Sequence, residues 1–227
     1  MFVDRSMTRD VITILEDATV LDAKATLDKH RIHHLPVVDD ARRLIGVVTD
    51  RDVRSALPSG VFDNEETARE RERILSLKVG EIMTRKPVSV SPSNTLEDVL
   101  LLMERTPVGA VPVVDDDRKI VGIISTRDLM RAFITVLGLR EPGTLLCLVV
   151  ENKLGQMKRI VDAISEERIP FGSILVARHW DEGKRAVFPY LLTQNVAHVK
   201  RKLEKMGFEL LNPMQWALEN PEKPEGK

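Results

Sequence analysis

The feature that most constrains the fold of this chain is an internal repeat. The stretch from His30 to Val53 returns as the stretch from Thr106 to Leu129, 76 positions later and without net insertion. The offset matches Pro36 with Pro112, Gly46 with Gly122, Thr49 with Ser125, and Asp52 with Asp128. It also relates the openings MTRD and MTRK, which begin at Met7 and Met83. A constant offset over this length indicates one structural unit used twice.

Each copy of the repeat predicts the element order β-α-β-β-α. An extended segment is expected at Val11–Leu15 in the first copy, followed by a helix with Thr19 as its N-cap. The apolar runs LPVV and LIGVVT then predict two strands, and the TDRD step starts a second helix. Neither copy is long enough to bury much core alone, so we expect the two copies to pack together.

The remainder of the chain predicts a further domain and two polar segments. We expect repeat copies at 1–57 and 78–140, a charged, solvated helical linker at 58–77, and a disordered tail at 213–227. Residues 144–212 predict the order β-α-β-β-α-β, the split β-α-β or ferredoxin-like arrangement, giving an α+β protein overall. Pro189 falls in a strand expected inside that sheet, so a bulge or a shortened strand is predicted there.

Composition excludes several classes of function. The formal net charge of −1 argues against nucleic acid as the main partner, because non-specific phosphate binding needs a basic surface. The single cysteine, Cys147, excludes an internal disulfide and favours a reducing compartment. No apolar signal core and no run of about 20 apolar residues is present, so we expect a cytoplasmic protein that neither spans nor enters a membrane.

The end of the second strand in each copy carries groups that suit an adenosine phosphate. A hydroxyl, Thr49 or Ser125, stands three residues before a carboxylate, with Arg51 or Arg127 between them. The carboxylate can accept both ribose hydroxyls, while the hydroxyl, the arginine and helix amides favour phosphate. The same four-residue pattern is also a capping box, which is the role expected at Thr19 and Thr95, so the pattern alone leaves both interpretations open.

The duplicated unit resembles the CBS-domain family, on the strands HLPVVD and AVPVVD, the steps IGVVTDRD and VGIISTRD, and the openings MTRD and MTRK. This resemblance covers roughly residues 2–137 and implies a tandem pair, or Bateman module, forming a pseudo-twofold disc. It implies up to two clefts for AMP, ADP, ATP or related ligands between the copies. The implied nucleotide-binding residues are Ile12, His30, Arg31, His34, Pro36, Thr49, Arg51, Asp52, Val88, Gly109, Ala110, Val111, Pro112, Ser125, Arg127 and Asp128.

The resemblance assigns a role to each group of these residues. Asp52 and Asp128 would hold ribose hydroxyls, and Thr49 and Ser125 would assist at ribose or phosphate. Ile12, Val88 and the residues leading into the two prolines would wall the base, and the His30-Arg31 pair would touch phosphate. The second copy has Thr106-Pro107 and Gly109-Ala110 where the first has His30-Arg31 and His33-His34, so occupancy of one cleft only is a hypothesis.

Catalytic and metal-binding interpretations find less support. His30, His33 and His34 cluster without a full set of further metal ligands, so no metal is expected. Asp50 and Asp52 lie beside Arg51, which favours their ionised forms and gives no proton-transfer role. Cys147 is expected in the core, and no nucleophile elbow, Walker or dinucleotide fingerprint is present. We therefore expect no enzymatic activity and no cofactor besides a regulatory nucleotide.

The C-terminal domain resembles the ACT family through ENKLGQM, in which Asn152, Leu154 and Gly155 stand where small ligands, often amino acids, dock. Two CBS repeats followed by an ACT-like domain resemble the AcuB-type acetoin-utilisation proteins. That resemblance implies a regulatory role in acetoin or acetate metabolism. We expect a homodimer or higher homo-oligomer and an unidentified partner enzyme. The alternatives are a constitutive oligomerisation scaffold with vestigial clefts and an amino-acid sensor acting through the ACT domain.

Overall fold

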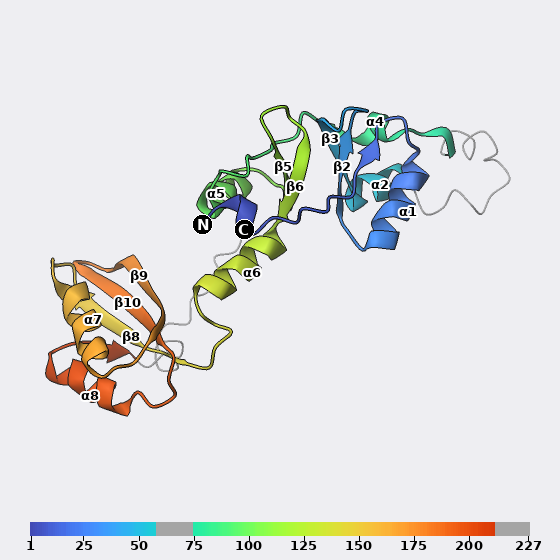
Figure 1. The fold of residues 1–227 in the computed structure, drawn as a ribbon. Coiled ribbons are helices and arrows are strands. Elements are labelled where there is room, and N and C mark those ends of the chain that lie inside the picture. The colour runs from blue at the N-terminus through green and yellow to red at the C-terminus, as the bar shows by residue number, and fades with distance from the viewer. Residues whose placement is uncertain (58–74, 212–227) are drawn as a thin grey trace. The chain divides into compact units, whose positions relative to one another are not determined.

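The computed structural model describes residues 1–57 and 75–211 and divides the chain into two compact units, Met1–Met130 and Arg131–Lys227 (Figure 1). Each unit is described by itself. The predicted helix within 58–77 falls largely outside the described residues, and the predicted tail at 213–227 falls entirely outside them. Among the described helices, none is long and apolar enough to cross a membrane.

The first unit contains both copies of the repeat. Its elements, with α6 extending past the end of the unit, are η1 (Val3–Arg5), β1 (Ile14–Leu15), α1 (Val20–His30), β2 (His34–Val38), β3 (Leu44–Thr49), α2 (Asp50–Ala56), α4 (Val79–Ile82), β4 (Thr84–Arg85), α5 (Leu96–Arg105), β5 (Ala110–Val114), β6 (Ile120–Ser125) and α6 (Thr126–Val136). The predicted pair of strands and the helix on each side of it are confirmed in both copies.

The two copies pair their strands in the same register. In the first copy β2 and β3 are antiparallel, with His34 opposite Thr49. In the second copy β5 and β6 are antiparallel, with Ala110 opposite Ser125. The β3 strand alternates buried and half-buried residues, as expected for a strand with one face on a core. Thr49 and Ser125 therefore each lie at the end of a strand, where a helix begins.

The opening segments cross from one copy to the other. Thr84 of β4 pairs with Val47 in the first copy, and Thr8 pairs with Ile123 in the second, both antiparallel. Each segment then returns to its own copy, as Ile14 does when it pairs in parallel with Val37. The expected strand at 11–15 is therefore reduced to β1, because the residues before Ile14 span the gap between the two sheets.

A methionine in each opening segment fits against a glycine of the opposite copy. A Cβ placed on Gly46 would overlap the sulfur of Met83, and one placed on Gly122 would overlap the sulfur of Met7. All four residues obey the repeat offset. The glycines are needed at these positions because their missing side chains make room for the crossing segments.

The second unit has the predicted order of elements, with one added strand. Its elements after α6 are β7 (Thr144–Leu145), β8 (Cys147–Glu151), α7 (Gln156–Glu166), β9 (Phe171–Asp181), β10 (Lys184–Leu191), α8 (Ala197–Lys205) and β11 (Glu209–Leu211). The strands lie in the order β11-β8-β10-β9, all antiparallel, with β7 also pairing with β10. Buried residues of β8, β10, α7 and α8 form one apolar core. This is the split β-α-β arrangement.

Pro189 lies within β10, which continues to Leu191 and is not shortened. The neighbouring strand is interrupted instead, at Leu146 between β7 and β8. Leu146 donates its N–H to the Pro189 carbonyl at 3.0 Å, but Pro189 has no N–H to donate in return. On the other side, the register with β9 shifts between Tyr190 and Leu191. The predicted bulge is thus confirmed and the alternative of a shortened strand is wrong.

Candidate functional site

Two clefts within the first unit bring the predicted nucleotide-binding residues together. The Asp128 cleft, named after the carboxylate in its wall, has a volume of about 430 Å³. The Asp52 cleft has a volume of about 600 Å³. Both volumes lie in the range of small-molecule sites.

The predicted residues divide between the clefts as the repeat requires. The Asp128 cleft contains Ile12, Arg31, His34, Pro36, Gly109, Ala110, Ser125, Arg127 and Asp128. The Asp52 cleft contains His34, Thr49, Arg51, Asp52, Val88, Gly109, Ala110 and Pro112. Each cleft therefore takes its opening segment from one copy and its hydroxyl and carboxylate from the other. The crossing of the opening segments produces this combination.

Two predicted residues do not line either cleft. His30 is the exposed last residue of α1. Val111 is fully buried, between Ala110 and Pro112, which both face a cleft. Successive side chains of a strand point to opposite faces, so Val111 belongs to the core while its neighbours reach the site. The basic contribution predicted for the His30-Arg31 pair comes from Arg31 alone.

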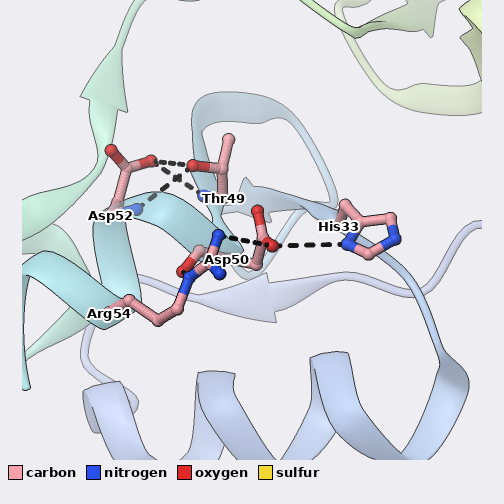
Figure 2. A network of polar contacts seen from close by, with 5 residues as sticks. All are labelled: His33, Thr49, Asp50, Asp52 and Arg54. Carbon is pink, nitrogen blue, oxygen red and sulfur yellow. Dashed lines mark hydrogen bonds and ion pairs between the residues drawn. The ribbon is translucent and has the colours of Figure 1, made fainter. Parts of the chain in front are cut away.

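Thr49 and Asp52 form a tight hydrogen-bonded pair at the start of α2 (Figure 2). Asp52 Oδ2 accepts from the Thr49 backbone N–H at 2.8 Å and from its hydroxyl at 2.7 Å. The Asp52 N–H donates to Thr49 Oγ1 at 3.2 Å. Ser125 and Asp128 repeat this geometry, with Ser125 Oγ donating to Asp128 Oδ2 at 2.6 Å.

The same capping box occurs twice away from the clefts. Thr19 with Asp22 and Thr95 with Asp98 cap α1 and α5, at exposed positions. Their hydrogen bonds with threonine lower the pKa values of both carboxyls. What distinguishes Asp52 is its place in a cleft and its partial burial. All its hydrogen bonds within the described residues use Oδ2 or the backbone, which leaves Oδ1 for a ligand. Capping and ligand binding are therefore compatible.

Asp50, the residue after Thr49, is already neutralised by protein groups. Its Oδ2 lies 3.0 Å from Arg54 Nη2 and 3.4 Å from His33 Nδ1 (Figure 2). Both partners are largely exposed, so this pairing adds little stability. Its consequence is electrostatic, because the negative charge of Asp50 at the wall of the Asp52 cleft is compensated.

His34 is shared by the two clefts and lies against the chain of the other copy. A Cβ on Gly109 would come within 3.1 Å of both Cε1 and Nε2 of the His34 ring. Burial lowers the pKa of His34, an effect that Asp50 opposes. A neutral imidazole at the centre of the two clefts is the form that this environment favours.

Sequence reasoning missed the charged residues that the opening segments bring to the clefts. Asp10 lines the Asp128 cleft and Lys86 lines the Asp52 cleft, at equivalent positions of the two opening segments. The repeat offset could have found them, since it aligns MTRD with MTRK. Their role depends on the crossing of the opening segments, and the local sequence does not predict this crossing.

A third cavity of about 430 Å³ lies between α1 and α2. Most of its charged residues form ion pairs with one another. Lys24 lies 2.8 Å from Asp28, and Arg54 lies 3.0 Å from Asp50. With these charges already paired, the cavity offers less to an ionic ligand than the two clefts do.

The residues predicted for the ACT ligand site lie on an exposed loop of the second unit. Asn152 donates its N–H to the Gly183 carbonyl at 2.8 Å, and the Leu154 side chain is fully exposed. Gly155 is the N-cap of α7 with φ 88°, a conformation that favours glycine. No group of three or more His, Cys, Asp or Glu side chains in the described part of the chain is placed to share a metal ion.

Comparison with known proteins identifies similar sequences. The sequence profile of the CBS domain matches residues 3–59 and 79–135. A CBS domain-containing protein of Dictyostelium discoideum is 35% identical over 138 residues, which are 60% of this chain and 94% of that protein. The L-aspartate semialdehyde sulfurtransferase of Methanocaldococcus jannaschii is 32% identical over 127 residues, 56% of this chain, but the chain spans only 22% of that protein.

Solved structures give corresponding matches. CBSX2 in complex with AMP has 31% identity and a TM-score of 0.50, covering 59% of this chain and 96% of that chain. A candidate acetoin utilization protein (AcuB) from Vibrio cholerae has 29% identity and a TM-score of 0.51, covering 63% of this chain and 98% of that chain.

Proposed function

Because the chain belongs to the CBS-domain family and carries two copies of the domain, we propose that it is a regulatory protein that binds an adenosine nucleotide between them. The observation that carries the proposal is the paired construction of the clefts. Each combines a strand-end hydroxyl, a carboxylate that caps a helix, an arginine beside it and an apolar residue of the crossing segment.

These groups match the parts of an adenosine nucleotide. A carboxylate can accept the 2′ and 3′ ribose hydroxyls, and arginine and hydroxyl groups bind phosphate. Ile12 with Pro36 in one cleft, and Val88 with Pro112 in the other, supply apolar surface for the base. The structure of CBSX2 in complex with AMP supports this ligand class.

The proposal assigns the protein a regulatory role and no catalytic one. Among the carboxylates at the clefts, Asp52 and Asp128 serve as helix caps and Asp50 is paired with Arg54, which are structural roles and not catalytic ones. A ligand would act by binding more tightly to one conformation of the protein than to another. The partner that reads this conformation would be a separate enzyme.

We also propose domain bounds, a location, an oligomeric state and a metabolic role for the chain. We propose CBS copies at 1–57 and 78–140, an ACT-like domain at 144–212, a cytoplasmic homodimer, and a role in acetoin or acetate metabolism. The likeness to the AcuB candidate from Vibrio cholerae supports the proposed link to acetoin metabolism, and the split β-α-β order of the second unit supports the proposed ACT-like domain. The alternatives are an oligomerisation scaffold and an amino-acid sensor that uses the Gly155 loop.

A thermal-shift panel with AMP, ADP, ATP and common amino acids tests the proposal. A ligand at 100 times its Kd should add about 2.7 kcal/mol to the free energy of unfolding. We expect an adenosine nucleotide to stabilise the protein, and the shift to shrink in Asp52→Asn, Asp128→Asn or both. Asp22→Asn is the matched control, because it removes an equivalent capping carboxylate outside the clefts.

Each alternative has its own outcome in the same panel. Stabilisation by amino acids alone would favour the sensor that acts through the Gly155 loop. The absence of any shift would favour the scaffold. Nucleotide stabilisation that persists in the double variant Asp52→Asn/Asp128→Asn would contradict the proposed clefts.

A further inference from the structure

The two clefts differ in charge at equivalent positions of their rims. The Asp128 cleft has Asp10 where the Asp52 cleft has Lys86, and Arg31 where the other has Pro107. The positions in each pair are separated by the repeat offset. At these positions the Asp128 rim therefore carries an acid and a base, while the Asp52 rim carries a base alone.

The remaining charges do not cancel this difference. Arg127 and Arg51 are equivalent, as are Asp128 and Asp52. Asp50 adds a carboxylate to the Asp52 cleft, but Arg54 compensates it at 3.0 Å. The net field at the Asp52 rim is consequently positive, whereas the Asp128 rim presents both signs.

The rim charges are available to a ligand. Within residues 1–57 and 75–211, Asp10, Arg31 and Lys86 take part in no ion pair. All three side chains are exposed. The Lys86 backbone has φ 49° and donates its N–H to the Ile45 carbonyl at 3.2 Å, which fixes the residue at the end of β4.

We propose, on the basis of the proposed nucleotide-binding function, that the clefts select different adenosine compounds by the charge at the 5′ position. The Asp52 cleft takes a phosphorylated adenosine, whose anionic group Lys86 and Arg51 attract. The Asp128 cleft takes an adenosine with a zwitterionic amino-acid group at its 5′ position, as in S-adenosylmethionine. There the ammonium group faces Asp10 and the carboxylate faces Arg31.

The charges on each rim explain which ligand the cleft should prefer. Phosphate would be repelled by Asp10, while a zwitterion satisfies an acid and a base on the same rim. Because these groups are exposed, each charge pair contributes modestly, corresponding to up to about fivefold in affinity, and less at high salt. Selection would arise from the sum of attraction in one cleft and repulsion in the other.

The test uses the full chain with one cleft weakened at a time. Isothermal titration of Asp128→Asn reports the Asp52 cleft, and titration of Asp52→Asn reports the Asp128 cleft. The ligands are AMP, adenosine, S-adenosylmethionine, S-adenosylhomocysteine and 5′-methylthioadenosine. We expect AMP to bind more tightly to Asp128→Asn, and the two amino-acid-bearing compounds to bind more tightly to Asp52→Asn.

Charge substitutions in these backgrounds identify the cause. Adding Lys86→Gln to Asp128→Asn should weaken AMP by up to about fivefold and adenosine hardly at all. Adding Asp10→Asn to Asp52→Asn should weaken S-adenosylmethionine and S-adenosylhomocysteine but not 5′-methylthioadenosine, which lacks the amino acid. Equal affinities of both ligand classes for both clefts, or charge substitutions without effect, would overturn the selection. If no adenosine compound binds the unmodified protein, the nucleotide-binding function itself fails.

Discussion

His34 lines both clefts, so its pKa depends on the environment of both. Burial lowers its pKa, Asp50 opposes that effect, His33 adds to it, and Asp52 opposes it. The folded chain therefore binds a proton at His34 less readily than the unfolded chain does. The contribution of His34 to the free energy of unfolding therefore decreases as the pH falls below the ordinary histidine pKa of 6.5.

We predict that His34→Gln reduces the pH dependence of stability between about pH 6.5 and 5, where an unperturbed imidazole titrates. Urea unfolding at intervals of half a pH unit measures it. The unmodified protein should lose stability more steeply with acidification than the variant over that range. Parallel curves would show that His34 does not contribute.

Gly46 allows the second opening segment to cross the first copy. A methyl group at this position would overlap the Met83 sulfur and lie 3.2 Å from the Thr84 carbonyl oxygen. Gly46→Ala should lower the free energy of unfolding by about 1–3 kcal/mol, as overpacking does. Chemical denaturation provides the measurement.

A double-mutant cycle separates overpacking from other effects of that substitution. In a Met83→Ala background the cost of Gly46→Ala should fall by at least about 0.5 kcal/mol, because the methionine side chain is gone. An unchanged cost would place the strain elsewhere.

At the scale of single residues, the sequence identifies the groups that follow local rules. Thr49, Asp52 and their counterparts could be predicted because strand end, hydroxyl and carboxylate are close in the chain. Lys86 and Asp10 could not be assigned a role in the same way. They reach the clefts only through pairing between distant segments, and a sequence motif says nothing about that pairing.

At the scale of elements, the capping boxes that pair a hydroxyl residue with an aspartate provide an internal comparison. Thr19 and Thr49 cap α1 and α2 with the same hydrogen bonds, but only Thr49 lines a cleft. The cap stabilises the helix in each case. The position of the threonine in the fold determines whether it can also contact a ligand.

Thr19→Ala and Thr49→Ala should each lower the free energy of unfolding by about 1 kcal/mol, the usual contribution of such a cap. Only Thr49→Ala should also weaken AMP binding. Denaturant unfolding and calorimetric titration of both variants make the comparison. Equal effects on affinity would show that Thr49 acts through helix stability alone.

The elements themselves were predicted where local signals are strong. The paired strands and flanking helices of each repeat have alternating burial, caps and apolar faces that the sequence displays. The strand predicted at 11–15 was too long, because its first residues cross between sheets to Ile14. The bulge near Pro189 was predicted from the missing N–H, but the accompanying break falls in the neighbouring strand.

At the scale of the whole molecule, the chain consists of two units with separate cores. Leu35, Val37 and Val48 belong to the core of the first copy of the repeat. Leu148, Ile160 and Leu203 belong to that of the second unit. A ligand that binds only the first unit should stabilise that unit alone.

Differential scanning calorimetry should accordingly show two transitions, with AMP raising the temperature of only one. At 100 times its Kd the nucleotide should add about 2.7 kcal/mol to the first unit. Trp180, in the second unit, identifies its transition by fluorescence. A shift of both transitions by the same amount would contradict independent stabilisation.

The most direct test of the proposed function is a crystal structure of the full chain grown with saturating AMP. The account predicts the nucleotide in the Asp52 cleft, with Asp52 Oδ1 within hydrogen-bonding distance of the ribose hydroxyls and the phosphate beside Lys86 or Arg51. Nucleotide found only in the cavity between α1 and α2 or on the second unit would contradict it. Two clefts without nucleotide at a concentration that saturates binding in solution would contradict it as well.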